Sequence, residues 1–245
     1  MSQLLNIVFD SKSVCLYRTY NGEANLIEEF EIQTTASFFL ENLKELIRKN
    51  HEHPELLRIY FNPEKYTLIP SSLFLPSKLE DYFQINFGAK NSDEFIHYES
   101  ILTLGTVLIF AIPTWLVSLK SEINAFGEIK TGLGRNLSLL NGHKSPNLIR
   151  CLISHGKMDV LVKSTGKLLL SNQYEIQNEE DVIYFLLLVL QKLNLHESTI
   201  LEVNCNSKAI DLNRFKTISE SIQELNESKI EFIEDKSYFN SILCV

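Results

Sequence analysis

An internal duplication constrains the fold of this chain more than any other feature of its sequence. When the chain is shifted against itself by 144 positions, residues 6–62 align with residues 150–206 without a gap. Ten aligned residues are identical, where ordinary residue frequencies give roughly three or four. Either the chain builds one supersecondary unit twice, or two unrelated α/β segments align by chance.

The order of expected elements is the same in the two copies. Each copy begins with two short strands and a hairpin turn, and the Asn21-Gly22 turn of the first copy is a strong hairpin signal. A third strand, a helix and a fourth strand follow, and Asn178 with Asp181 resembles a capping box at the second helix. We expect strands at 6–9, 14–20 and 56–61, matched by 150–153, 158–163 and 200–205, with third strands ending at Ile32 and Ile176.

Three meandering strands, a crossover helix and a fourth strand form the core of a ribonuclease H-like unit. Two such units in tandem make the actin-like ATPase architecture. The predicted fold class is therefore α/β, with duplicated ribonuclease H-like units and mixed sheets with flanking helices. We expect a first lobe at 1–145, with an inserted subdomain at about 66–130, and a second lobe at 146–245.

Further elements are expected outside the two repeats. Gly132 and Gly134 indicate a turn, since the third glycine of a dinucleotide-binding loop is absent. Strands are expected at 66–74, 106–112 and 229–233, and helices at 77–87, from Pro113 to Gly127, and at 212–225.

Charge and cysteine spacing exclude several function classes. The chain of 245 residues has 31 acidic and 23 basic side chains, a net charge of −8 that disfavours nucleic-acid binding. Its four cysteines lie far apart and give no zinc-binding spacing, and the histidines form no metal motif. The longest apolar run, Val182 to Leu190, is much shorter than the ~20 residues of a membrane span. We therefore expect a cytoplasmic protein without membrane insertion or a metal site.

Two stretches carry resemblances to known families. Thr106 to Val117, followed by a helix and by Glu128 to Leu133, resembles the type IV pilus assembly proteins of the PilM group, which are actin-like. Tyr66 to Phe74 and Leu169 to Phe185 resemble DUF3822, a family of uncharacterised Bacteroidetes proteins. The second resemblance covers nearly the whole chain and brings no established activity with it.

The resemblance to actin-like ATPases implies a nucleotide site at the first turn of each lobe. There an Asp-x-Gly pattern followed by a small hydroxyl residue holds phosphates and a metal ion. Asp10 and Ser13 retain the acid and the hydroxyl in the first turn, but Lys12 replaces the glycine; in the second turn Gly156 is present, but Ser154 replaces the acid. The chain has only nine glycines and none after Gly166, so we expect no cofactor, with ATP and magnesium as the alternative.

The crossover helices differ in polarity. In the gapless alignment, the polar positions of helix 38–48 become mostly apolar in the second copy. A helix that is apolar all round is buried on all sides, either by another part of the chain, such as Phe239 to Val245, or by a partner. For the second case we expect Phe185, Leu188 and Val189 to form an interaction surface.

These observations favour a non-catalytic actin-like scaffold or protein-interaction module, with a protein partner or a second copy of the chain as its ligand. No residue set indicates a catalytic site. One alternative is a divergent actin-like nucleotide-binding protein or kinase that uses Asp10, Ser13 and Gly156. The other is a pilus- or secretion-type cytoplasmic adaptor, which rests on the resemblance of fold alone.

Overall fold

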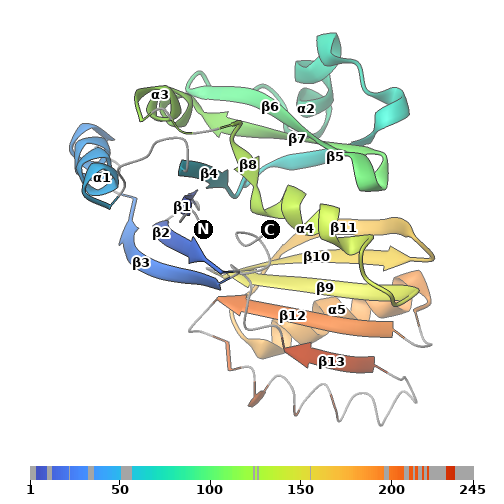
Figure 1. Ribbon diagram of the computed structural model, residues 1–245. Helices are drawn as coiled ribbons and strands as arrows, with labels where there is room; N and C mark the ends of the chain where they lie inside the picture. The colour runs from blue at the N-terminus through green and yellow to red at the C-terminus, as the bar shows by residue number, and fades with distance from the viewer. Residues whose placement is uncertain are drawn as a thin grey trace. The chain divides into compact units, whose positions relative to one another are not determined.

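Two five-stranded sheets with the same strand order form the framework of the protein in its computed structural model (Figure 1). They belong to two units, within residues 1–138 and within residues 139–238. The structure describes residues 4–9, 13–21, 23–32, 36–50, 57–123, 125, 127–154, 156–195, 199–206, 210–211, 213–214, 217, 220 and 230–234.

The sheet of the first unit has the order β3-β2-β1-β4-β8. Its first three strands form an antiparallel meander, whereas β4 and β8 run parallel to β1. Helix α1 (Ala36–Asn50) makes the crossover and contributes Leu43 and Ile47 to the core. The strands are β1 (Leu4–Phe9), β2 (Ser13–Tyr20), β3 (Glu23–Glu31), β4 (Leu57–Phe61) and β8 (Lys130–Thr131).

The sheet of the second unit repeats this topology in the order β11-β10-β9-β12-β13. Its crossover helix α5 (Glu179–Leu193) begins as predicted, because the side chain of Asn178 accepts a hydrogen bond from the Asp181 amide at 3.0 Å. The strands are β9 (Asn147–Ser154), β10 (Lys157–Ser164), β11 (Lys167–Glu175), β12 (Thr199–Asn206) and β13 (Ile230–Glu234). The predicted strand at 229–233 corresponds to β13, and most of the predicted helix at 212–225 lies outside the described residues.

The shift of 144 positions found in the sequence holds for the strands. The bounds of β10 and β11 are those of β2 and β3 moved by 144 residues. The hairpin turns agree as well, since Asn21 and Thr165 both have a positive φ, of 53° and 47°. The predicted fold class, a duplicated ribonuclease H-like pair, is therefore confirmed.

The crossover helices follow a different shift, of 143 positions. Helix α1 begins at Ala36 and α5 at Glu179, and the buried Leu43 then corresponds to the buried Leu186. The second copy has one residue fewer between its third strand and its helix, so the gapless alignment is wrong by one residue in the helix. The shift of 144 positions returns in the fourth strand, where Leu57 corresponds to Leu201. Val189 therefore matches the partly buried Leu46 rather than the exposed Glu45, and only 3% of its surface is exposed.

The first unit carries an inserted subdomain between β4 and β8. Its three-stranded antiparallel sheet has the order β5-β7-β6, and the side chain of Phe83 on α2 packs against it. The elements are β5 (Tyr66–Pro70), α2 (Leu79–Phe87), β6 (Glu94–Ile101), β7 (Thr106–Pro113) and α3 (Thr114–Glu122), with 3-10 turns at 71–73, 76–78 and 102–104. The predicted helix from Pro113 ends at Glu122 instead of Gly127, and β6 was not predicted.

The predicted turn at Gly132 and Gly134 is wrong, because both glycines lie in the first turn of helix α4 (Gly132–Leu140). Thr131 starts this helix: its Oγ1 accepts a hydrogen bond from the Gly134 amide at 2.7 Å. The carboxylate of Glu99 on β6 accepts hydrogen bonds from the amide and the hydroxyl of Thr131, at 3.1 and 3.0 Å. The Glu99 carboxylate thus holds the beginning of α4.

Replacing Gly134 by alanine is expected to destabilise the protein by about 1–2 kcal/mol. In an open helix the same change stabilises by up to about 1 kcal/mol. Here the new Cβ would lie 2.5 Å from the Glu99 carboxylate and 2.7 Å from the Thr131 hydroxyl, so the hydrogen-bonded helix start has to shift. Urea denaturation measures the change. Gly142→Ala is the control, since its nearest contact is an ordinary 3.5 Å; a gain in stability for Gly134→Ala would contradict the prediction.

The ionisation of Glu99 gives a second prediction, on pH dependence. Burial raises the pKa of Glu99 above its ordinary value, against the opposing effects of Lys130 and of the hydrogen bonds from Thr131. A carboxyl whose pKa is raised on folding stabilises the fold below its unfolded pKa, and this contribution is lost as the pH rises through the folded pKa. Glu99→Gln keeps an acceptor for Thr131 and removes the buried charge. The stability of Glu99→Gln relative to the parent should therefore rise as the pH increases above the ordinary glutamate pKa of about 4; a stability difference that does not change with pH would contradict this prediction.

Candidate functional site

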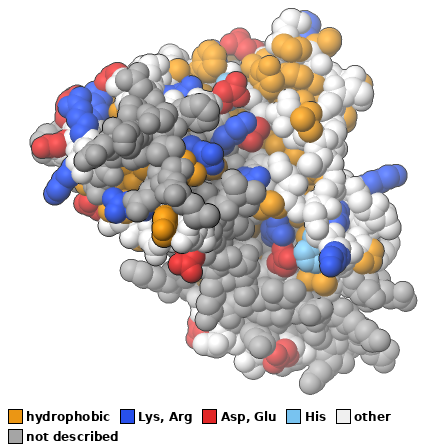
Figure 2. Space-filling model, viewed as in Figure 1, with side chains coloured by type: hydrophobic (Ala, Val, Ile, Leu, Met, Phe, Trp, Pro, Cys, Tyr) orange, Lys and Arg blue, Asp and Glu red, His pale blue; other side chains and the backbone are white. Residues whose placement is uncertain are grey.

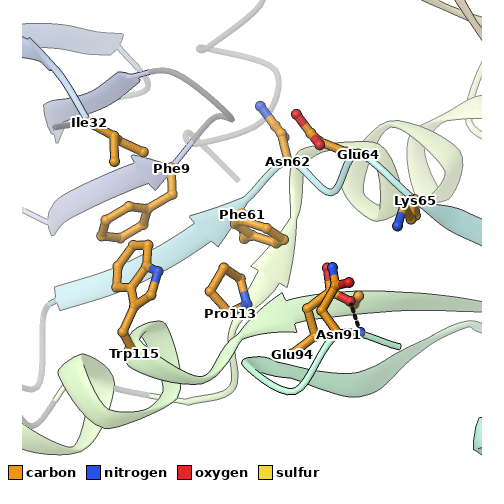
Figure 3. Close-up of a pocket in the computed structure, with 11 residues that line it drawn as sticks. Phe9, Ile32, Phe61, Asn62, Glu64, Lys65, Asn91, Glu94, Pro113 and Trp115 are labelled. Carbon is orange, nitrogen blue, oxygen red and sulfur yellow. Dashed lines mark hydrogen bonds between the residues drawn. The ribbon is translucent and has the colours of Figure 1, made fainter. Parts of the chain in front are cut away.

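A pocket of about 330 Å³ lies in the first unit, at the carboxyl ends of the parallel strands β1 and β4 (Figure 3). Phe9 and Phe61 are the last residues of these strands, and Trp115 comes from the first turn of α3. The rings of Phe9 and Trp115 meet edge to face, with centroids 5.6 Å apart and planes at 66°. In open α/β sheets, ligands bind outside the carboxyl ends of the strands.

One side of the pocket carries the polar and charged lining residues. Figure 3 shows Phe9 and Trp115 on one side, with Lys65, Asn91 and Glu94 on the other. Glu64 completes the charged lining, so the pocket has two carboxylates and one ammonium group. The Glu94 carboxylate accepts a hydrogen bond from the backbone amide of Asn91 at 2.9 Å, which fixes the position of the carboxylate in the pocket wall.

Backbone hydrogen bonds hold the walls of the pocket together. The Asn62 amide donates to the carbonyl of Phe9 at 2.9 Å, which joins the ends of β1 and β4. The Thr114 amide donates to the carbonyl of Asp93 at 2.8 Å, which fixes the start of α3 beside the start of β6. Pro113 precedes α3 and presets the backbone there, so Trp115 enters the pocket from a rigid turn.

The predicted nucleotide residues lie in different units. Asp10 lies outside the described residues. Ser13 begins β2 in the first unit, and its side chain is buried. Gly156 lies in the turn between β9 and β10 of the second unit, with φ of +76°, and its carbonyl accepts a hydrogen bond from the Ile176 amide at 2.8 Å.

The described lining of the pocket does not fit a polyphosphate. Its two carboxylates outnumber its one ammonium group, which disfavours phosphate oxygens, and aromatic side chains line the described ends of β1 and β4. Within the described ranges, no group of three His, Cys, Asp or Glu side chains could hold a metal ion.

The three residues predicted as an interaction surface differ in their surroundings. Val189 belongs to the core of the second unit. Phe185 is half-buried and stacks on Tyr174 of β11, with ring centroids 4.3 Å apart. Leu188 is half-buried, and Tyr184, one helical turn before it, has 61% of its surface exposed. Phe239 to Val245, the other expected cover of this helix, lie outside the described residues.

Sequence reasoning missed the pocket because its residues are far apart in the chain. Phe9 and Phe61 have the pattern of core strand residues, and Trp115 has helical core spacing. Only one signal was available: the single tryptophan of the chain follows directly on a strand, proline and threonine.

Comparisons with known proteins identify the fold without an activity. A family model described as "Protein of unknown function (DUF3822)" matches residues 4–206. A solved structure from Bacteroides thetaiotaomicron, described as a protein with actin-like ATPase fold and unknown function, is similar at 18% identity with a TM-score of 0.75. The structural match covers 99% of this chain and 96% of the Bacteroides chain.

A PilM–PilN type IV pilus biogenesis complex is also similar in structure, at 9% identity with a TM-score of 0.50. The structural match covers 99% of this chain and 95% of the matched chain of that complex. A comparison with curated proteins finds no match. Among the helices that the structure describes, none is long and apolar enough to cross a membrane.

Proposed function

Because the chain belongs to the DUF3822 family and has the actin-like ATPase fold, we propose that it is a non-catalytic protein-interaction module. Its pocket at the ends of β1 and β4 receives a short segment of a protein partner. The observation that carries this proposal is the composition of the pocket, in which three aromatic rings line the apolar part and the carboxylates of Glu64 and Glu94 outnumber the one ammonium group of Lys65.

The pocket defines the chemistry of the segment. Its volume accommodates one large side chain, and the rings of Phe9 and Trp115 favour an aromatic or branched aliphatic group. The carboxylates of Glu64 and Glu94 favour a lysine or arginine next to that group. A segment of this kind fits better than a nucleotide, which brings several negative charges.

The surface of the inserted subdomain supports the same function. Figure 2 shows apolar side chains gathered over this part of the protein. The exposed apolar residues of the subdomain include Leu73, Leu75, Ile85, Phe95 and Leu102, whose exposed fractions range from 50% to 87%. Several large apolar side chains exposed on one subdomain are consistent with a surface that binds another protein.

A pilus- or secretion-type adaptor is the second candidate function. The PilM structure with the same fold was determined together with PilN. A cytoplasmic module that binds another protein of a pilus or secretion assembly is consistent with that fold.

Selection from a random peptide library tests the proposal. We expect enriched peptides to combine an apolar residue with a nearby lysine or arginine. Trp115 is the only tryptophan, so binding in the pocket should change the intrinsic emission directly. Glu94→Lys should weaken binding, whereas Glu45→Lys, the same charge change on the exposed face of α1, should not. Peptides that leave the emission unchanged and bind Glu94→Lys equally well would overturn the proposal, as would the absence of enrichment.

Mg-ATP provides the opposing test. We expect millimolar Mg-ATP to raise the unfolding temperature of the parent protein no more than it raises that of the Asp10→Ala variant. A ligand at ~100 times its Kd would stabilise by about 2.7 kcal/mol, which moves the midpoint by a few degrees in a chain of this size. A rise that Asp10→Ala abolishes would instead assign a nucleotide site to the protein.

A further inference from the structure

A second cavity in the first unit, of about 420 Å³, gathers three cationic side chains. Arg58 comes from β4, Lys130 from β8 and Arg135 from α4. Residues of β6, among them Glu99, complete the wall. None of these residues lines the aromatic pocket described above.

One donor atom of the Arg135 guanidinium lacks a hydrogen-bond partner within the described part of the chain. Its Nη2 atom has no contact with solvent and no hydrogen-bond partner there. A buried donor left without an acceptor is costly, and native structures seldom keep one without reason. Arg135 lines the cavity, so an acceptor that enters there, with a small shift of the side chain, satisfies this donor.

The internal repeat supplies a comparison for Arg58. Its counterpart in the second unit, 144 positions on, is Glu202, whose carboxylate accepts hydrogen bonds from Nε and Nη2 of Arg150, both at 2.6 Å. His143 approaches the same carboxylate at 3.1 Å. In the first unit the counterpart of Arg150 is the neutral Asn6. The charge at this position is therefore compensated in the second unit, while in the first unit Asn6 supplies no opposite charge.

The acidic residues of the cavity do not provide that charge. The Glu99 carboxylate is occupied by the amide and hydroxyl of Thr131, and Lys130 lies 3.9 Å from it. Glu128 is exposed, so water screens its charge. Among the residues that the structure describes, two guanidinium groups thus remain available from two different elements, β4 and α4.

We propose that this cavity binds a small molecule through a phosphate or carboxylate group held by Arg58 and Arg135. A guanidinium offers parallel N–H donors that match two oxygens of such an anion. The cavity is larger than the anion alone, so the rest of a small metabolite has room beside it. The binding of this ligand is separate from the docking of a partner segment in the aromatic pocket.

Thermal unfolding and calorimetric titration test the proposal with inorganic phosphate and succinate as probes, at ionic strength held constant with sodium chloride. We expect a saturable rise in unfolding temperature with at least one probe, and the two probes distinguish phosphate from carboxylate chemistry. Arg58→Met and Arg135→Met should each weaken binding by about tenfold or more. Arg48→Met, the same change on the exposed face of α1, should leave it unchanged.

Two results would overturn the proposal: no rise with either probe, or a rise that persists in both variants. If Arg135→Met does not fold, Arg135→Lys keeps the charge and removes the paired donors; an affinity equal to that of the parent would then contradict the role of Arg135. The emission of Trp115 should not respond to the probes, because this residue does not line the cavity. Failure of this proposal therefore leaves the peptide experiment unaffected.

Discussion

Replacing Lys163 by alanine is expected to lower the free energy of unfolding by about 3–5 kcal/mol. Only 3% of the residue is exposed, and its ammonium group donates to the carbonyl oxygens of Leu140 and His143, both at 2.9 Å. These carbonyls lie at the end of α4 and in the segment after it. Without the ammonium group they lose a charged donor, and the lost side chain leaves a cavity in the second unit.

Two variants separate these causes in urea denaturation. Lys163→Met fills most of the volume without a donor, so it isolates the contribution of the hydrogen bonds. Lys167→Ala, at an exposed position in the same hairpin, should change stability by less than about 0.5 kcal/mol. A loss of under 1 kcal/mol in Lys163→Ala would show that the two carbonyls find other donors.

The second large effect is expected at the aromatic pocket. Trp115→Ala should weaken the peptides selected against the parent protein by about 30-fold to 900-fold, since tryptophan anchors at the centre of an interface contribute about 2–4 kcal/mol. The ring forms one wall of the pocket and contacts Phe9, so its loss removes both the apolar surface and the shape of the site. The anisotropy of a labelled peptide is the measurement, because the variant has no tryptophan emission.

Trp115→Phe is the matched variant, since it keeps an aromatic ring at the same position. We expect it to retain most of the affinity. Circular dichroism should show that both variants remain folded. Equal affinity of the parent and a folded Trp115→Ala would place the peptides elsewhere on the protein.

The sheets were predictable from the sequence because their signals are local. Hairpin turns such as Asn21-Gly22 and the spacing of apolar residues determine a meander without knowledge of distant contacts. Strand β6 was not predictable in this way. It lies at the edge of its sheet, where Phe95 is half exposed and the partly buried Glu99 serves the start of α4, so its alternation is irregular.

The sequence predicts a turn where helix α4 begins, for a related reason. Two glycines in three residues are typical of a turn, and only the tertiary contact between Glu99 and Thr131 explains the small residue at Gly134. The pocket and the cationic cavity depend on such distant contacts throughout. The internal repeat nevertheless helps to identify the cationic cavity. Glu202 of the second unit pairs with Arg150, whereas its counterpart Arg58 lies beside the neutral Asn6.

The short strand β8 has a consequence for the order in which the first unit folds. It contributes two residues to the sheet, paired with Tyr60 and Phe61, and the chain passes through the whole inserted subdomain before reaching it. Closing so long a loop costs conformational entropy, and the hydrogen bonds of a two-residue strand offset only a small part of that cost. The β6–β7 hairpin, which forms from neighbouring residues, shortens that loop. We therefore expect the subdomain to fold before the sheet is complete, so that mutations in its hairpin away from Glu99, the hairpin residue that contacts Thr131, still slow the pairing of β8.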